Sequence, residues 1–381
     1  MVERENNKLG QDWIRSKVIG QDLCTGCGAC VNLCPYQKIH RDSTVNLHVC
    51  DRLDGRCRNY CPRSPVDLDR LRKALFDPVD FVPELGTFKG LYMTRASDES
   101  VRAVAQHGGT VSALIKLALE EGFINTALLS DSNENHLPDA HPVSAPEDVV
   151  SRAGSRFVVS PTVACFNEVS KGAVDKIGVV ATPCQALALA KMRVNPWPND
   201  VERTKKLALV IGLFCGWTLR WQKVRDLLTQ KAGEGEVTGM DIPPSGHGVL
   251  EVHSGEGTRE IPIEKVTPCV REACNYCFDM TCEFSDLAVG SARSSEGWSV
   301  DKGWNQIIVR SSLGQQLLDL AKRKGVLEFK DVPAENIEKL KQASAKKKQA
   351  CLKNLTKKTG TDDDLIYLDC EDAAVCRIKG V

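Results

Sequence analysis

The cysteines are the residues of this sequence whose type and spacing point most directly to chemistry. The chain has 381 residues, and 17 of them are cysteine. Two of these, Cys274 and Cys277, form a CxxC pair, which can hold one soft metal centre. By itself a CxxC pair fits zinc, iron–sulfur or dithiol redox chemistry, and a structural zinc knuckle is the simplest alternative. Two further thiols flank the pair: Cys269 and Cys282.

A more specific pattern lies near the N-terminus. It reads Cys24-x2-Cys27-x2-Cys30-x3-Cys34-Pro35. This run is typical of bacterial ferredoxins, in which the first three thiolates bind one 4Fe-4S cluster and the fourth reaches a second cluster. Cys61, which is followed by Pro62, is expected to complete the first cluster.

A second N-terminal cluster is expected to use Cys34, Cys50 and Cys57, which leaves it one ligand short. The spacing between Cys50 and Cys57 also departs from the ferredoxin pattern. The candidates for the missing ligand are Asp51, Asp54 and a cysteine from elsewhere, and a three-iron cluster needs none. The sequence leaves these alternatives open.

Charge and hydropathy narrow the class of protein. Lys plus Arg and Asp plus Glu are both 50, so the net charge is zero, which argues against nucleic acid or an anionic membrane as the main partner. The charged N-terminus has no apolar stretch of the kind found in signal peptides, and the longest apolar run, near 207–217, is too short for a transmembrane segment. We therefore expect a cytoplasmic protein, and one that acts as a subunit of a larger complex.

The elements that must position the cysteines follow from the hydrophobic pattern. Strands are predicted at 90–96, 126–130, 176–181, 207–214, 287–290 and 305–310, helices after the glycine turn at 108–109 and at 314–323, and short antiparallel strands within 236–266. The predicted fold class is an α+β ferredoxin-like module followed by an α/β domain with a mixed sheet. The predicted divisions are an N-terminal extension (1–20), the iron–sulfur module (21–66), a linker (67–88), the α/β domain (89–325), and a C-terminal helix with a charged tail (326–381). The lysine-rich stretch from about 338, which includes the run 346–348, and the acidic run 362–364 are interpreted as a solvated helix end and a partner-facing tail. The C-terminal cysteines Cys351, Cys370 and Cys376 have no recognisable ligand spacing.

Two glycine-containing turns are candidates for anion binding. The first precedes the predicted helix and comprises His107, Gly108, Gly109, Thr110 and Ser112. Backbone amides at a helix N-terminus suit a phosphate, although a plain turn is the alternative. The second, with a short strand predicted after it, comprises Arg152, Gly154, Ser155 and Arg156. An arginine there is a charge partner for an anion, and an ordinary solvated arginine is the alternative.

Cys184 and Cys215 each follow a predicted strand of the α/β domain. If those strands are parallel, both thiols lie at the carboxyl edge of the sheet, where ligands bind in such folds. A buried core thiol is the alternative for each. Cys184 is flanked by Thr182, Pro183 and Gln185 at the start of a predicted helix.

Taken in order, these motifs resemble one family. After the ferredoxin run come HGGTVSALIKLAL, RAGSRFV, TPCQA, GLFCG, CNYCFDMTCEFSDLAVGS and GW. Over about residues 20–325 the chain resembles the beta subunit family of coenzyme F420 hydrogenases and dehydrogenases. The resemblance implies non-covalent FAD, held by the two glycine turns and the residues around Cys184, and a central 4Fe-4S cluster. It also implies that the ligands of this cluster are Cys184, Cys215, Cys274 and Cys277.

The resemblance implies an oxidoreductase that passes two electrons between a deazaflavin coenzyme and two or three iron–sulfur clusters. A flavin can accept a hydride and release single electrons, whereas a cluster carries single electrons, so a chain with both converts one transfer into the other. The expected partners are a hydride-carrying coenzyme such as F420 and either other redox subunits or ferredoxin. The family also includes a plant chlorophyll reductase and bacterial proteins from organisms without this coenzyme, so the substrate does not follow. Two alternatives remain: a relay subunit without a substrate site, and a ferredoxin-fed flavin reductase of another organic molecule.

Overall fold

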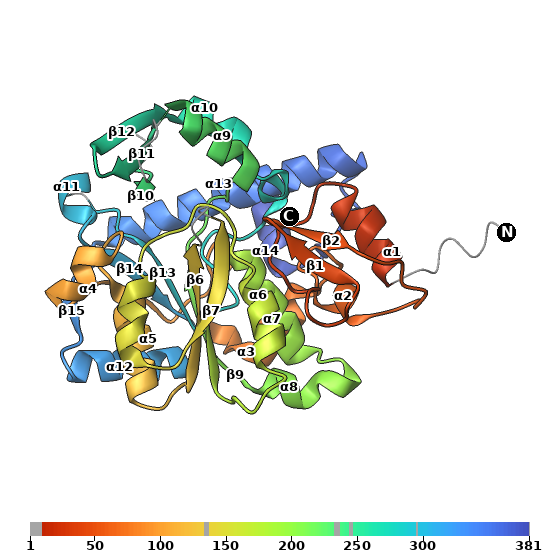
Figure 1. The fold of residues 1–381 in the computed structure, drawn as a ribbon, viewed down its shortest axis with the longest axis horizontal. Helices are drawn as coiled ribbons and strands as arrows, with labels where there is room; N and C mark the ends of the chain where they lie inside the picture. Colours follow the sequence, from red (N-terminus) through yellow and green to blue (C-terminus); the bar gives the residue numbers. More distant parts are fainter. Residues whose placement is uncertain (1–9, 133–136, 232–236, 244–246, 295, 381) are drawn as a thin grey trace.

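A mixed eight-stranded sheet forms the centre of the molecule (Figure 1). The computed structural model describes residues 10–132, 137–231, 237–243, 247–294 and 296–380. The strand order is β15-β5-β14-β13-β9-β8-β6-β7, and the neighbours β13, β9, β8 and β6 are parallel. The remaining neighbours pair antiparallel, so the sheet is mixed as predicted. The strands are β5 (Gly90–Ala96), β6 (Thr126–Ser132), β7 (Pro138–Val143), β8 (Ile177–Ala181), β9 (Leu207–Leu213), β13 (Leu287–Ser291), β14 (Asn305–Val309) and β15 (Leu327–Lys330).

Helices cover both faces of this sheet because its central strands carry apolar residues on both sides. Leu129, Leu209 and Val289 pack under α5 (Thr110–Glu120) and α12 (Ser312–Arg323). On the other face Leu128 and Val179 pack under α6 (Thr162–Val169) and α7 (Pro183–Val194). The other helices around the sheet are α4 (Glu99–Val104), α8 (Val201–Lys205) and α11 (Trp298–Asp301), with short 3-10 turns η3 (Pro146–Arg152) and η4 (Pro198–Asp200).

A second, three-stranded antiparallel sheet lies beyond the carboxyl edge of the parallel strands (Figure 1, top). The side-chain amide of Gln106 donates to Asp241 Oδ1 (2.5 Å) and joins the two sheets. This arrangement confirms the short antiparallel strands predicted within 236–266. The elements are β10 (Val237–Asp241), β11 (Val249–Ser254) and β12 (Gly257–Pro262), flanked by α9 (Trp221–Lys231), α10 (Ile263–Val266), η5 (Thr267–Cys269) and η6 (Glu272–Tyr276).

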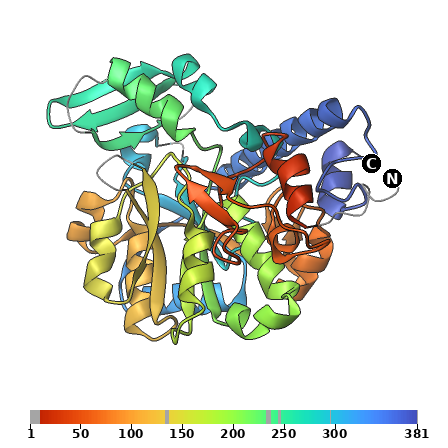
Figure 2. The same cartoon turned by 45° about the vertical axis from the view of Figure 1, so that its right-hand side comes forward.

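The N-terminal module packs against α6 and α7 (Figure 2). Asn167 of α6 donates to the carbonyls of Ala29 (3.2 Å) and Val31 (2.8 Å). Gly28 has a positive φ, and a side chain there would lie 2.8 Å from the backbone nitrogen of Ala164, so the module can approach α6 this closely only with glycine at that position. The module consists of α1 (Gln11–Trp13), a π-helical turn η1 (Ile14–Ile19), the hairpin β1 (Gln37–His40) and β2 (Ser43–Asn46), and α2 (Arg56–Tyr60).

The predicted linker and tail are both part of the folded body. Residues 67–88 form α3 (Leu68–Leu75), η2 (Pro78–Asp80) and the small hairpin β3 (Phe81–Val82) and β4 (Gly86–Thr87), and α3 packs on α7. Buried Arg72 of α3 pairs with buried Asp372 (2.8 Å), and Val66 bridges Leu368. The C-terminal segment contributes an edge strand, β15, and two helices: α13 (Ala334–Thr359) and α14 (Ala373–Lys379).

Two expectations are wrong in detail. The short strand predicted within 152–165 is absent from this described segment, where Val158 makes one isolated bridge to Leu219 and α6 begins at Thr162. The solvated helix end predicted for the lysine run is also wrong, because the run lies in the middle of α13 and Lys348 is fully buried. Within the described residues, no helix is long and apolar enough to cross a membrane.

Candidate functional site

Cys184 and Cys215 lie at the carboxyl edge of two neighbouring strands. β8 and β9 pair in parallel, as predicted, so the segments that follow them emerge side by side. Cys184 is in the first turn of α7, where Thr182 Oγ1 lies 3.4 Å from its sulfur. Cys215 follows β9 and is fixed by its N–H, which donates to the carbonyl of Met280 (2.9 Å).

The CxxC pair lies at the short 3-10 turn η6, which packs against the segment after β9. The backbone N–H of Thr218 donates to the sulfur of Cys274 (3.3 Å), which ties the turn to the segment after β9. Burial raises the pKa of Cys184 and of Cys215, and in both cases the thiols of Cys274 and Cys277 raise it further. The four predicted thiols, from three segments, therefore interact electrostatically, and we call them the central thiol group.

Two cations adjoin the central thiol group, and the sequence analysis did not identify them. Burial acts to raise the pKa of Cys277, but the cations Lys347 and Arg63 outweigh it and lower that pKa. Arg63 is 2% exposed, donates to the carbonyl of Ala273 (3.0 Å), and stacks on the ring of Tyr367 (4.7 Å). The site thus stabilises a thiolate where burial alone would favour a neutral thiol.

The second group of thiols belongs to the N-terminal module. It comprises Cys24, Cys27, Cys30 and Cys61, and we call it the proximal thiol group. Burial raises the pKa of Cys30, and the thiols of Cys24, Cys27 and Cys61 raise it further. Lys191 of α7 is buried beside this group and donates to the carbonyl of Cys61 (2.8 Å), and burial lowers the pKa of this lysine to about 8.

The third group comprises Cys34, Cys50 and Cys57, and we call it the distal thiol group. Burial raises the pKa of Cys57 to about 11, and the thiols of Cys34, Cys61 and Cys50 contribute to this increase. Across the described ranges of the chain, no three His, Cys, Asp or Glu side chains are arranged to hold a single metal ion. The thiols of each group are thus close enough to interact electrostatically without converging on one shared ion.

The three groups are connected in series. After burial, the largest effect on the pKa of Cys27 comes from Cys184 of the central group, which raises it. Cys61 of the proximal group interacts in the same way with Cys57 of the distal group. Buried Arg271 joins the CxxC segment to the module, since it donates to the carbonyls of Cys24 (3.3 Å) and Asp42 (2.7 Å).

The first glycine turn directly precedes helix α5, as predicted, and it lies at the carboxyl edge of the sheet. Gly109 has a positive φ and caps α5, and Asn305 Oδ1 accepts from the N–H of Thr110 (3.2 Å). A side chain at Gly108 would meet Arg95 and Asn305, so the glycine is needed for packing within the protein. Ser112 is half-buried on the first turn of α5. His107 lies 4.0 Å from Asp241, and burial lowers the pKa of this histidine.

The second turn adjoins the end of β6. Arg152 and Arg156 both pair with Asp131, the latter at 3.6 Å, and burial lowers the pKa of Arg156. The two arginines and the one carboxylate together carry one net positive charge. Gly154, with a positive φ, lets the chain turn between the two arginines, and Ser155 beside it is exposed. This charge is what an anion site needs.

The residues around Cys184 have structural roles. Thr182 and Gln185 form a capping box, and Pro183 occupies the first turn of α7. Gln185 is 2% exposed, and its amide accepts from the N–H of Thr182 (2.8 Å) and donates to the carbonyl of Ser160 (2.6 Å). Both ends of this side chain are therefore occupied within the protein, which argues against contact with a cofactor.

The two cysteines that flank the CxxC pair are buried, and so is Cys351 of α13. Cys269 lies in an apolar cluster with β11 and β12. Cys282 is fully buried against Gly212 of β9, where a built side chain would lie 2.5 Å from its sulfur. Burial raises the pKa of Cys282, and the thiol of Cys184 contributes. Burial likewise raises the pKa of Cys351 to about 12, and the thiol of Cys277 contributes. The buried residues of α13 recur at the spacing of helical turns, and this pattern could have identified the buried face of the helix from the sequence. They are Leu340, Ser344, Lys348, Cys351, Leu352 and Leu355.

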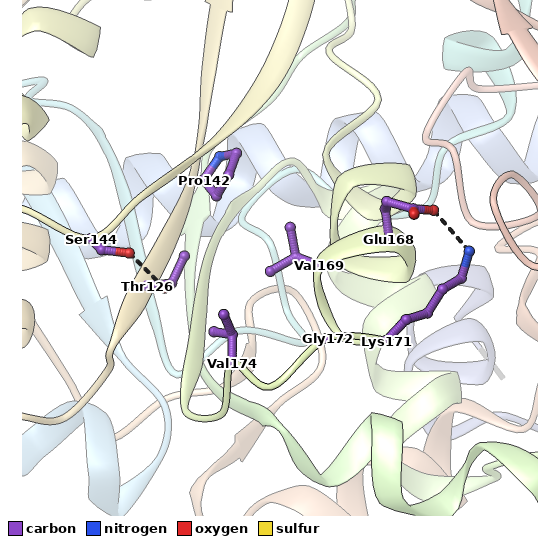
Figure 3. Close-up of a pocket in the computed structure, with 8 residues that line it drawn as sticks. All are labelled: Thr126, Pro142, Ser144, Glu168, Val169, Lys171, Gly172 and Val174. Carbon is purple, nitrogen blue, oxygen red and sulfur yellow. Dashed lines mark hydrogen bonds and ion pairs between the residues drawn. The ribbon is translucent and has the colours of Figure 1, made fainter.

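One described cavity lies away from this chemistry. Its volume is about 600 Å3, and Figure 3 shows the residues that line it, among them Thr126 at the start of β6 and the exposed pair Glu168–Lys171. Thr126 is at the opposite end of β6 from Asp131 and the carboxyl edge. None of the thiol groups lines it.

Comparison with protein families gives three matches. The two parts of the family described as coenzyme F420 hydrogenase/dehydrogenase, beta subunit, match residues 91–167 (N-terminal part) and 174–335 (C terminus). A 4Fe-4S binding domain matches residues 17–37.

Individual relatives agree with these matches. The chain is 28% identical over 279 residues to the coenzyme F420 hydrogenase subunit beta of Methanothermobacter thermautotrophicus, covering 71% of this chain and 95% of the relative. It is 29% identical over 252 residues to the coenzyme F420 hydrogenase subunit beta of Methanococcus voltae, covering 65% and 86%. It is 26% identical over 352 residues to the coenzyme F420-dependent sulfite reductase of Methanocaldococcus jannaschii, covering 88% of this chain and 51% of the reductase.

Among solved structures, the fold resembles a chain in the F420-reducing [NiFe] hydrogenase complex from Methanosarcina barkeri, studied as a xenon derivative. The TM-score is 0.66 at 24% identity, and the likeness covers 72% of this chain and 94% of that chain. At this identity the likeness shows a shared fold.

Proposed function

Since this chain belongs to the beta subunit family of coenzyme F420 hydrogenases and dehydrogenases, whose named members are oxidoreductases, we propose that it exchanges a hydride with a deazaflavin coenzyme of the F420 type and single electrons with a redox partner. FAD and three iron–sulfur clusters are the groups that this activity requires. When bound, the flavin supplies the conversion between hydride and single electrons, and the clusters supply one-electron transfer.

The observation that carries the proposal is the series of central, proximal and distal thiol groups. Soft thiolates are the usual ligands of iron–sulfur clusters. An electrostatic interaction between the thiols of Cys27 and Cys184 links the proximal group to the central group, and one between Cys61 and Cys57 continues the series. A hydrogen bond from Arg271 to the carbonyl of Cys24 (3.3 Å) supports the first of these links. Zinc would fit single groups of this kind but has no redox chemistry, so a connected series favours iron–sulfur clusters.

The chain's own residues position these groups and keep water from them. Arg271 and Lys191 fasten the backbone of the proximal group to the α/β domain. Arg63 and Lys347 supply positive charge next to Cys277, which favours the thiolate that iron binds.

An internal repeat favours Asp54 as the fourth ligand of the distal group. Cys27-x2-Cys30-x3-Cys34-Pro35 is matched in spacing by Asp54-x2-Cys57-x3-Cys61-Pro62. The last cysteine of the first copy, Cys34, is assigned to the distal group. The last cysteine of the second copy, Cys61, is assigned to the proximal group. By this symmetry Asp54 occupies the position of Cys27 and serves the distal group with Cys57. A carboxylate can bind iron, although it is a harder ligand than a thiolate.

Two features at the carboxyl edge support FAD binding. The first is the leftover positive charge of Arg152 and Arg156 beside Asp131, which suits a phosphate. The second is the N-terminus of α5, where Asn305 accepts from Thr110 and leaves the next amides, on half-buried residues, for an anion.

The proposed partner is another redox module. The sulfite reductase relative contains a region like nearly all of this chain within a polypeptide about twice as long as the matched part. A unit that occurs joined to a reductase is suited to deliver electrons to, or take them from, a separate subunit. The distal thiol group, at the end of the series farthest from the central group, is the proposed exit.

The test is anaerobic purification of the whole chain with iron, acid-labile sulfide and flavin quantified, for the wild type and the Cys277→Ser and Cys269→Ser variants. We expect flavin and the iron of three clusters in the wild type. Cys277→Ser should lose the iron of one cluster and keep flavin that reduced F420 can reduce, but the N-terminal clusters should stay oxidised. Cys269→Ser, from the same segment, should behave as the wild type. Unchanged iron in Cys277→Ser would refute the central cluster, and a wild type without releasable flavin would refute the flavin assignment.

A further inference from the structure

Helix α13 crosses the central thiol group, although it lies beyond the residues matched by the family comparison, which end at 335. It packs along η6, and Asn354 of α13 donates to the carbonyl of Asn275 within the CxxC pair (2.9 Å). Downstream of α13, Tyr367 donates its hydroxyl hydrogen to the carbonyl of Tyr276 (2.9 Å). The C-terminal segment is therefore a wall of the central site.

Lys347 is the residue of this wall that turns toward the thiols. Its ammonium group donates to the carbonyls of Cys215 and Gly216, at 2.7 Å each. The two neighbouring lysines differ from it. Lys346 is exposed, whereas Lys348 is fully buried and pairs with Glu283.

The position of Lys347 places a positive charge beside the central thiol group, because its ammonium group lies against the backbone of Cys215, one of the four thiols. In a partly buried site a charge pair interacts several times more strongly than in water. Any added negative charge at this site is stabilised by the same ammonium group.

We propose that Lys347 is a positioning residue that fixes the Cys215 loop and raises the reduction potential of the central cluster by favouring its more negative, reduced state. This proposal rests on the central cluster proposed above. One electron enters the cluster on reduction, supplied by the hydride donor through the flavin, and no proton or bond change at Lys347 is needed.

The test is a redox titration of the holoprotein followed by electron paramagnetic resonance, comparing the wild type with Lys347→Gln, Lys347→Arg and Lys346→Gln. Lys346→Gln is the matched control, because it removes the same charge from an exposed position one residue away on α13. We expect Lys347→Gln to make reduction of the central cluster about tenfold less favourable, which is about 59 mV for one electron. In Lys347→Arg and Lys346→Gln the reduction potential of the central cluster should stay near the wild-type value. The potentials of the N-terminal clusters should stay near the wild-type values in all variants.

The outcomes separate the two proposals. A wild type without iron at the central site overturns both. A wild type with that iron, in which Lys347→Gln and Lys346→Gln have the same central potential, overturns only the role of Lys347. If Lys347→Gln loses the central iron, Lys347→Met provides a second neutral variant. Loss from both with retention in Lys347→Arg supports the need for charge here, and loss from Lys347→Arg as well overturns it.

Discussion

Replacing Lys348 by alanine should loosen α13 from the central site. Its ammonium group pairs with Glu283, and the two side chains are 0% and 3% exposed. The same group lies 4.3 Å from the centre of the Phe278 ring. Removing one partner of a buried ion pair costs about 3–5 kcal/mol, because the other charge stays buried without compensation. With about 1.4 kcal/mol for each factor of ten, α13 should open roughly 100-fold more often or more.

Hydrogen exchange measured by mass spectrometry on peptides within 334–359 is the assay. Backbone amides of the helix exchange when it opens locally, so their exchange rate reports the free energy of that opening. These peptides should therefore exchange faster by the factor by which opening increases. The matched control is Lys171→Ala. Lys171 pairs with Glu168 at 2.8 Å on the surface, with 50% and 61% of the side chains exposed, and such pairs contribute about 0–1 kcal/mol.

A compensating variant tests the reasoning. Lys348→Met combined with Glu283→Gln removes both charges and keeps most of the volume, so it should restore much of the protection lost in Lys348→Ala. If Lys348→Ala accelerates exchange in α13 by less than tenfold, the buried pair does not hold this helix in place. If the double variant is no better protected than Lys348→Ala, the unpaired charge of Glu283 is not the cause.

Two further outcomes test the distal group and the carboxyl edge. Asp54→Cys should convert the distal cluster to one with four thiolate ligands and make its iron more resistant to chelators, whereas Asp51→Cys should not, and Mössbauer spectra that are the same for both variants would contradict the repeat argument. Burial lowers the pKa of His107 below its ordinary value near 6.5, so the unfolded chain binds the proton more readily. Stability should therefore be full above about pH 6.5 and fall as the pH drops toward the lowered pKa. The slope of urea stability against pH in that window should be smaller in His107→Gln, and an unchanged slope would show that His107 is not responsible.

The sequence by itself determines much of this protein, because many of its cysteines lie close together along the chain. The run from Cys24 to Cys34 and the CxxC pair place thiols within one or two turns of backbone, so their grouping needs no knowledge of the fold. Six strands of the main sheet were also predicted, since their apolar runs end at turns, as at 177–181 before Thr182, whereas the edge strands β7 and β15 were not predicted. Because consecutive parallel strands share an edge, the sequence also placed Cys184 and Cys215 together.

Tertiary structure alone decided which side chains complete the site. Arg63 donates to Ala273, 210 residues later in the chain, and Lys348 pairs with Glu283, 65 residues earlier. A run of lysines is normally solvated, because burying an unpaired ammonium group is costly. Only a partner brought from another part of the chain offsets that cost, and no local pattern in the sequence identifies this partner. The same holds for Asn167 of α6, which donates to the carbonyls of Ala29 and Val31 and so joins the module to a helix that packs on the sheet.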